Sequence, residues 1–160
     1  MSKAAQLVEI AKQLATSRNG FVESLGPGMG NRRTNAFVSE LREKALARFG
    51  LDHSEVRFCK DNSSRFDFYF RDEQTIVEIA LGLPNPNTEF EKDLLKALVA
   101  RDHDHPVARL VFVSRQGAIK KCEQPARAAM IAWALKHHQL TVEIVELGGR
   151  TRIRVRRSKA

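Results

Sequence analysis

Residues 65–83 read RFDFYFRDEQTIVEIALGL and contain two apolar runs separated by the polar turn RDEQ. The runs predict β-strands over about 65–71 and 75–82, and each carries one acid, Asp67 or Glu78. Because strand side chains alternate between faces, a hairpin of these strands can bring the two carboxylates together. A carboxylate inside an apolar strand needs a metal ion, a basic side chain or a network of hydrogen bonds.

Two interpretations of this acid pair are open. Oxygen ligands on neighbouring strands suit a hard cation such as Mg²⁺. The alternative is a solvated face on which each acid pairs with Arg65, Arg71 or a lysine. The remainder of the chain is needed to choose between them.

Length and composition predict one domain, 1–160. The chain has 160 residues, 42% apolar and 29% charged, as folded globular proteins do. It contains no apolar run of membrane-spanning length and no apolar signal-peptide core, so we expect no membrane partner and a cytoplasmic location. Cys59 and Cys122 lie far apart and indicate neither a disulfide framework nor a zinc cluster.

The net charge of +8 favours a polyanionic partner, most simply nucleic acid, although solubility alone is an alternative explanation. The last predicted strand places four arginines on one face, and these repel one another unless an anion lies across them. We therefore predict contacts with phosphates; an edge strand that resists aggregation is the alternative. The predicted nucleic-acid-binding residues are Arg150, Arg152, Arg154, Arg156 and Arg157, with Arg32 and Arg33 from the glycine-rich loop 24–33.

Helical periodicity and end signals predict four helices around the strands. The first covers 3–17, and the second covers 35–49 with Thr34 as its N-cap. A capping box of Thr88 and Glu91 opens a third helix that ends near residue 101. A fourth begins at Pro125 and ends near residue 138, with Trp133 in its buried stripe.

The remaining strands follow from short apolar runs and turns. They are predicted at 56–60, at 110–113 with both faces covered, and as a C-terminal hairpin within 140–157 that turns at Gly148–Gly149. The run DHDHP at 102–106 is predicted to be a polar connector, with a metal site as the alternative. In the third helix we expect Phe90, Leu94, Leu95, Leu98 and Val99 to form the buried face, with Lys92 nearer its edge than Lys96.

Within residues 34–114 the predicted order is helix, three strands, helix, strand, with the acids on the second and third strands. At this point the chain resembles the PD-(D/E)XK nuclease superfamily, which has an αβββαβ core and the motif Asp followed by Glu-x-Lys. The matching residues are Asp67 and Glu78-Ile79-Ala80. The resemblance implies an α/β restriction-endonuclease-like fold, with a mixed central sheet between helices. An N-terminal helix, a C-terminal helix and a basic β-hairpin would be added to this core.

The resemblance also implies a site. Asp67, Glu78 and the carbonyl of Ile79 would bind one or two Mg²⁺ or Mn²⁺ ions. The first core helix often supplies another acid, for which Glu40, on the flank of the buried stripe, is a better match than Glu43. The motif lysine is replaced by Ala80. Some members carry a substitute lysine on the following helix, and Lys92 is the leading candidate for that role.

Three functions are compatible with this pattern. The first is a metal-dependent endonuclease that hydrolyses phosphodiester bonds in DNA, with RNA as the alternative substrate. The second is a non-catalytic nucleic-acid-binding module on the same fold, which Ala80 favours. The third is a protein-interaction domain that binds an acidic partner through the basic strand. Many nucleases of this fold dimerise, but no residue here identifies a homodimer interface.

Overall fold

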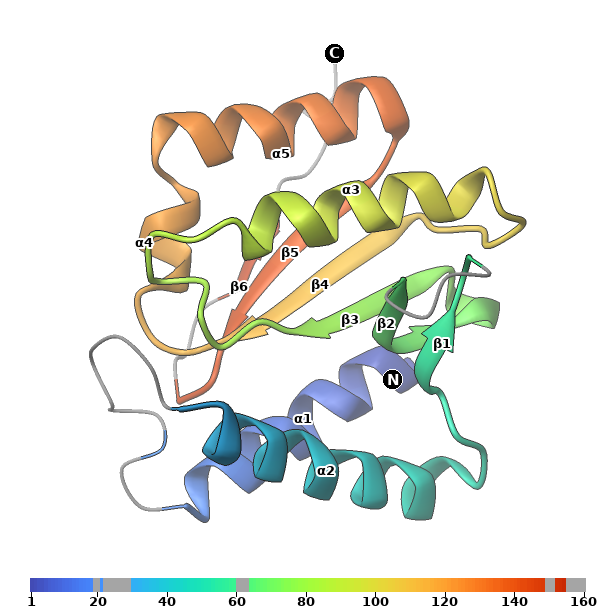
Figure 1. Cartoon of the computed structure of the whole chain (residues 1–160), viewed down its shortest axis with the longest axis vertical. Coiled ribbons are helices and arrows are strands. Elements are labelled where there is room, and N and C mark those ends of the chain that lie inside the picture. The colour runs from blue at the N-terminus through green and yellow to red at the C-terminus, as the bar shows by residue number, and fades with distance from the viewer. Residues whose placement is uncertain (19–20, 22–29, 60–63, 149–151, 155–160) are drawn as a thin grey trace.

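A computed structural model of the chain describes residues 1–18, 21, 30–59, 64–148 and 152–154. For residues 30–31 and 152–154 it describes the backbone only. Its centre is a six-stranded sheet in which the strands lie in the order of the sequence (Figure 1). The strands are β1 (Ser54–Arg57), β2 (Arg65–Phe70), β3 (Thr75–Ile79), β4 (Arg109–Ser114), β5 (Thr141–Glu146) and β6 (Arg152–Arg154).

The sheet is mixed. Strand β2 pairs antiparallel with both β1 and β3. Strand β4 pairs parallel with both β3 and β5, and β6 pairs antiparallel with β5. A short 3-10 turn, Arg71–Glu73, joins β2 to β3, as the polar RDEQ segment predicts. The parallel strands need long crossovers, which helices on the faces of the sheet provide.

Helices cover both faces of the sheet. On one face lie α1 (Lys3–Thr16) and α2 (Gly30–Phe49), and on the other lie α3 (Glu89–Arg101) and α5 (Pro125–His138), with the short α4 (Ala118–Cys122) before α5 (Figure 1). The α/β class and the mixed sheet between helices are therefore confirmed. The element order from α2 to β4 is also the predicted one.

Alternation along the strands supplies a separate core for each face. Phe68, Phe70 and Val77 pack towards α1 and α2, whereas Tyr69 and Ile76 pack towards α3 and α5. Because both faces are covered, β4 is apolar along most of its length, as predicted for 110–113. The predicted N-terminal helix is present, and the second helix buries Phe37, Leu41 and Ala45. The C-terminal hairpin is present too, although residues 149–151 of the hairpin turn lie outside the described residues.

Several local predictions are wrong. Helix α2 begins at Gly30, so Thr34 is not its N-cap and the predicted loop 24–33 is helical from residue 30. Thr88 precedes α3 but makes no side-chain capping hydrogen bond. The helix α4 was not expected, and Trp133 lies at the surface with 46% of its area exposed.

The error at Trp133 has a simple cause. Helix α5 buries Arg127, Ile131 and Ala134 instead of the predicted stripe. The guanidinium of Arg127 donates to the carbonyls of Leu83 (2.8 Å) and Asn87 (3.2 Å), and these bonds satisfy its buried charge. Hydrophobicity alone therefore assigned the wrong face of α5 to the core. Among the described helices none is long and apolar enough to cross a membrane.

Candidate functional site

The candidate site lies where β2 and β3 stop pairing through their backbones. The described pairs run from Phe70–Thr75 to Phe68–Val77. At the next position, where Asp67 and Glu78 would be opposite each other, the carboxylates replace the backbone ladder. Asp67 Oδ2 accepts the Ile79 N–H at 2.8 Å, and Glu78 Oε2 accepts the Asp67 N–H at 3.2 Å. The two acids therefore satisfy backbone donors that the separating strands leave open.

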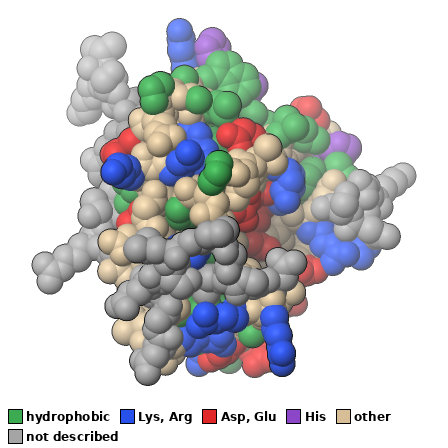
Figure 2. Space-filling view, turned by 60° about the vertical axis from the view of Figure 1, so that its left-hand side comes forward, with side chains coloured by type: hydrophobic (Ala, Val, Ile, Leu, Met, Phe, Trp, Pro, Cys, Tyr) green, Lys and Arg blue, Asp and Glu red, His purple; other side chains and the backbone are tan. Residues whose placement is uncertain are grey.

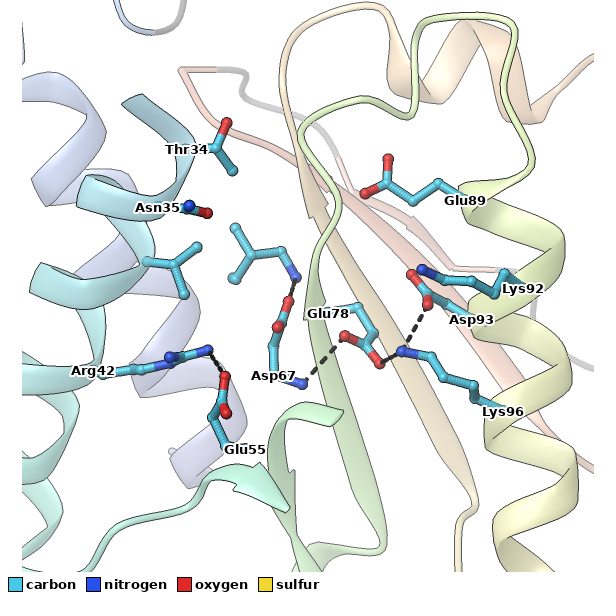
Figure 3. Close-up of a pocket in the computed structure, with 12 residues that line it drawn as sticks. Thr34, Asn35, Arg42, Glu55, Asp67, Glu78, Glu89, Lys92, Asp93 and Lys96 are labelled. Atoms are coloured by element: carbon cyan, nitrogen blue, oxygen red, sulfur yellow. Dashed lines mark hydrogen bonds and ion pairs between the residues drawn. The ribbon is translucent and has the colours of Figure 1, made fainter. Parts of the chain in front are cut away.

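A pocket of about 400 Å³ opens at this separation. Helix α2 lines one side and α3 lines the other, with Asp67, Glu78 and Ile79 between them (Figure 3). Figure 2 shows acidic side chains in a recess of the molecule that is bordered by lysine and arginine side chains. The structure thus brings together, in one open pocket, the three residues that the sequence predicts as metal ligands.

A lysine from α3 contacts the buried carboxylate, but it is Lys96 and not the predicted Lys92. Lys96 Nζ lies 3.0 Å from Glu78 Oε1, 2.8 Å from Asp93 Oδ1 and 3.0 Å from the carbonyl oxygen of Arg65. Lys92 also lines the pocket, but it is an exposed residue. The structure therefore places Lys96, one turn further along α3, beside the acid pair.

The sequence argument missed Lys96 because it assigned the wrong buried face to α3. The observed face is Phe90, Asp93, Leu94, Ala97 and Ala100, whereas Leu95 is 61% exposed. A buried aspartate in this stripe was the available signal. An acid in such a position needs a cation nearby, and a lysine three residues later on the same helix is within reach.

Burial and mutual repulsion perturb the acids of the pocket. Burial, and then the charges of Asp67 and Asp93, raise the pKa of Glu78 well above its ordinary value. Burial likewise raises the pKa of Asp93 and of Glu89. Burial opposes the charge on Lys96, but the carboxylates of Glu78 and Asp93 outweigh it and raise the pKa of Lys96. The pocket therefore concentrates negative charge that its basic side chains compensate only in part.

The donor set fits a hard cation. It consists of oxygen atoms alone, and a carboxylate that accepts one or two hydrogen bonds keeps lone pairs for a ligand. In an extended strand the N–H and C=O of one residue point the same way, so we expect the Ile79 carbonyl to face the gap that its N–H faces. The described residues contain no group of three or more His, Cys, Asp or Glu arranged to hold a metal ion. The oxygen ligands available to a cation are the carboxylates of Asp67 and Glu78 and the carbonyl of Ile79, and water would complete the coordination.

Glu40 is not part of this pocket. Its carboxylate lies 2.5 Å from Arg18 Nη2 and 3.7 Å from Lys44 Nζ. The hydrogen bond from Arg18 lowers the pKa of Glu40. The structure thus places the predicted third acid in a surface ion pair on the α1–α2 side of the molecule.

The predicted phosphate-binding arginines divide into three groups, according to how much of each the structure describes. Arg32 and Arg33 are exposed at the beginning of α2, directly before Thr34 and Asn35, which line the pocket. For Arg152 and Arg154 the structure describes only the backbone, in β6. The remaining three, Arg150, Arg156 and Arg157, lie outside the described residues.

Position 80 is occupied by buried backbone and a small side chain. Ala80 is 1% exposed, its N–H donates to the Val113 carbonyl at 2.9 Å, and its own carbonyl accepts the Ser114 hydroxyl at 2.6 Å.

Comparisons with protein-family models, curated proteins and solved structures gave no match to this chain.

Proposed function

We propose that this chain is a Mg²⁺-dependent endonuclease of the PD-(D/E)XK superfamily that hydrolyses phosphodiester bonds in DNA. The supporting observation is the pocket at the β2–β3 separation, which gathers Asp67, Glu78 and Lys96. The α2–β1–β2–β3–α3–β4 order around it corresponds to the αβββαβ core of that superfamily. The proposal includes a restriction-endonuclease-like core and a cytoplasmic location.

In this proposal Asp67, Glu78 and the Ile79 carbonyl hold the cation, with Mn²⁺ as a substitute. A bound cation of this kind acts as a Lewis acid and lowers the pKa of a coordinated water. The backbone N–H of Ile79 fixes the Asp67 carboxylate, and the N–H of Asp67 does the same for Glu78. Both acids are thereby oriented before substrate binds.

Lys96 takes the role of the missing motif lysine. Its ammonium reaches the Glu78 carboxylate from α3, so an alanine at position 80 does not leave the pocket without a cationic side chain. Asp93 holds this ammonium at 2.8 Å and fixes its position. All three N–H donors of Lys96 are occupied, by Glu78, Asp93 and the Arg65 carbonyl. To stabilise the negative charge that develops during hydrolysis, Lys96 exchanges one of these hydrogen bonds for one to a phosphate oxygen.

The test is cleavage of supercoiled, linear and branched DNA in Mg²⁺ or Mn²⁺. The Asp67→Asn variant keeps the size of the side chain and an oxygen for the Ile79 N–H, but it loses the charge. We expect a rate loss of about 100-fold or more, because a metal ligand is removed. Glu40→Gln is the matched control, since this acid lies in a surface ion pair, and it should cut normally.

Two results would reject the nuclease proposal: no cutting of any substrate, or unchanged cutting by Asp67→Asn. The second candidate function, a non-catalytic nucleic-acid-binding module, is favoured by Ala80. It predicts DNA binding that weakens steeply with salt, needs no divalent cation and is unaffected by Asp67→Asn.

A further inference from the structure

A second basic side chain reaches the same pocket from the opposite helix. Arg42 of α2 lines the pocket on the side away from Lys96. Its Nη2 lies 2.6 Å from Glu55 Oε1, and Figure 3 shows the side chain extending from α2 towards Glu55 and the part of the pocket occupied by Asp67. We propose that Arg42 binds a phosphate of the substrate next to the one that is cut, and that Glu55 holds it until the substrate arrives. This inference rests on the proposed function.

The guanidinium of Arg42 has capacity for a further ligand. Among the described residues its buried Nε atom has no hydrogen-bond partner, while 31% of the side chain remains exposed. A buried donor without a partner is costly, and five N–H donors in a planar fork match the oxygens of a phosphate. A phosphate can be bound by two parallel hydrogen bonds once the side chain turns so that the buried Nε–H also faces it.

Glu55 can lose its contact with Arg42 at a small cost in free energy, because a second arginine also binds it. Its carboxylate is shared, with Oε1 on Arg42 and Oε2 at 2.5 Å from Arg65 Nη1. When Arg42 turns to a phosphate, Glu55 therefore retains one arginine and is not left as an isolated charge. Glu55 also has a φ of +51°, a conformation that side-chain-bearing residues rarely adopt and that is retained where the surrounding structure requires it.

The charges of the pocket favour this location for an anion. Lys96 is already held by Glu78 and Asp93, which repel a phosphate that is not screened by a cation. Arg42 lies across the pocket from that acid cluster, with Asp67 between the two (Figure 3). A nucleic-acid strand with its scissile phosphate at Asp67 would therefore bring a neighbouring phosphate to Arg42.

The experiment measures binding without cleavage. A fluorescein-labelled single-stranded DNA and the corresponding duplex are titrated in EDTA across a range of salt concentrations. We expect Arg42→Gln to weaken binding about 10-fold and to reduce the salt slope by about one phosphate contact. Arg42→Lys should keep the salt slope but recover only part of the affinity, since a lysine lacks the planar fork.

The Glu55→Gln variant separates a binding role from a structural one. It removes the acid that competes for Arg42, so we expect DNA to bind several-fold more tightly. If Arg42 only held α2 to β1, any gain would come from the removed charge and from Arg65, and it would persist in the Arg42→Gln, Glu55→Gln double variant. Arg48→Gln, on the same helix and bonded to Gln6, is the matched control and should bind as the wild type does.

The outcomes separate this inference from the nuclease proposal. Unchanged binding by Arg42→Gln, or no gain in Glu55→Gln with an intact thermal unfolding transition, overturns the inference even if the protein cuts DNA. If Glu55→Gln does not fold, the Arg42→Gln and Arg42→Lys pair decides. Binding that depends on Arg42 in a protein that cuts no substrate supports the inference and rejects cleavage. No DNA binding by the wild type in EDTA overturns the inference, and the cleavage assay in Mg²⁺ then decides the nuclease proposal by itself.

Discussion

The acids of the pocket and the acids of the surface respond oppositely to their surroundings. Burial raises the pKa of Glu78, Asp93 and Glu89. On the surface, hydrogen bonds from Arg18 and Lys3 lower the pKa of Glu40 and of Asp72, respectively. The same chemical group therefore opposes the stability of the fold in one place and supports it in another. Repulsion between buried carboxylates occurs in the pocket, which is where a cation would relieve it.

The largest effect on stability is expected from removing the cation that balances the pocket. Lys96→Met leaves the buried carboxylates of Glu78 and Asp93 without their counter-charge and should lower the free energy of unfolding at pH 7 by about 3 kcal/mol. The loss should shrink on acidification, since protonation of the acids with raised pKa values removes the uncompensated charge. Urea unfolding at pH 7 and pH 5 measures both effects.

Lys92→Met is the matched control on the same helix. Because Lys92 is exposed, the change should stay within about 0.5 kcal/mol. Equal losses in the free energy of unfolding for the two lysine variants would show that the buried ion pair adds no more stability than an exposed lysine does. That result would contradict the contrast between pocket and surface.

A smaller effect of opposite sign is expected at Glu89. Burial and the charge of Asp93 raise the pKa of Glu89. A folded-state pKa above the unfolded value means that the ionised form costs stability at higher pH. Glu89→Gln should therefore raise the free energy of unfolding at pH 7, and this gain should disappear as the pH falls through the raised pKa. A lower stability at pH 7 would contradict the account of repulsion in the pocket.

The smallest effect is expected on the surface. Arg18 lowers the pKa of Glu40, so this ion pair contributes stability above the unfolded-state pKa and loses it as the pH falls through the folded-state value. Glu40→Gln should cause a slight loss at pH 7 that disappears at high salt, because exposed pairs are screened. Thermal unfolding at low and high salt tests this. A loss as large as that of Lys96→Met would remove the contrast between the two regions.

Most of the fold follows from periodicity in the sequence. The apolar alternation in 65–83, the fully apolar run 110–113 and the proline at 125 each predict an element that is present. The failures concern side chains that hydrophobicity ranks wrongly. Trp133 lies outside while Arg127 lies inside, because carbonyl acceptors on the 83–87 segment meet a guanidinium there. A ranking by residue type cannot anticipate such acceptors, since another part of the chain supplies them.

The candidate site divides in the same way. Asp67 and Glu78 could be selected from the sequence, because each is a lone acid within an apolar strand and the turn between them is short. The choice between Lys92 and Lys96 could not be made from the sequence, since it depends on the rotation of α3 about its axis. That rotation is set by Phe90, Leu94 and Ala97, which pack against the sheet. Glu40 failed for a related reason, because its partner Arg18 comes from the segment just after α1 and not from the sheet.

The sequence by itself determined that the 110–113 strand is covered on both faces, the order of elements from α2 to β4 and the two strand-borne acids, because local alternation and chain order encode these. Only the tertiary structure decided which cations join the acids, Lys96 from α3 and Arg42 from α2. These contacts link segments far apart in the chain, and their geometry depends on how each helix turns when its buried face packs. The position of charge around Asp67 and Glu78 is therefore a property of the packed fold.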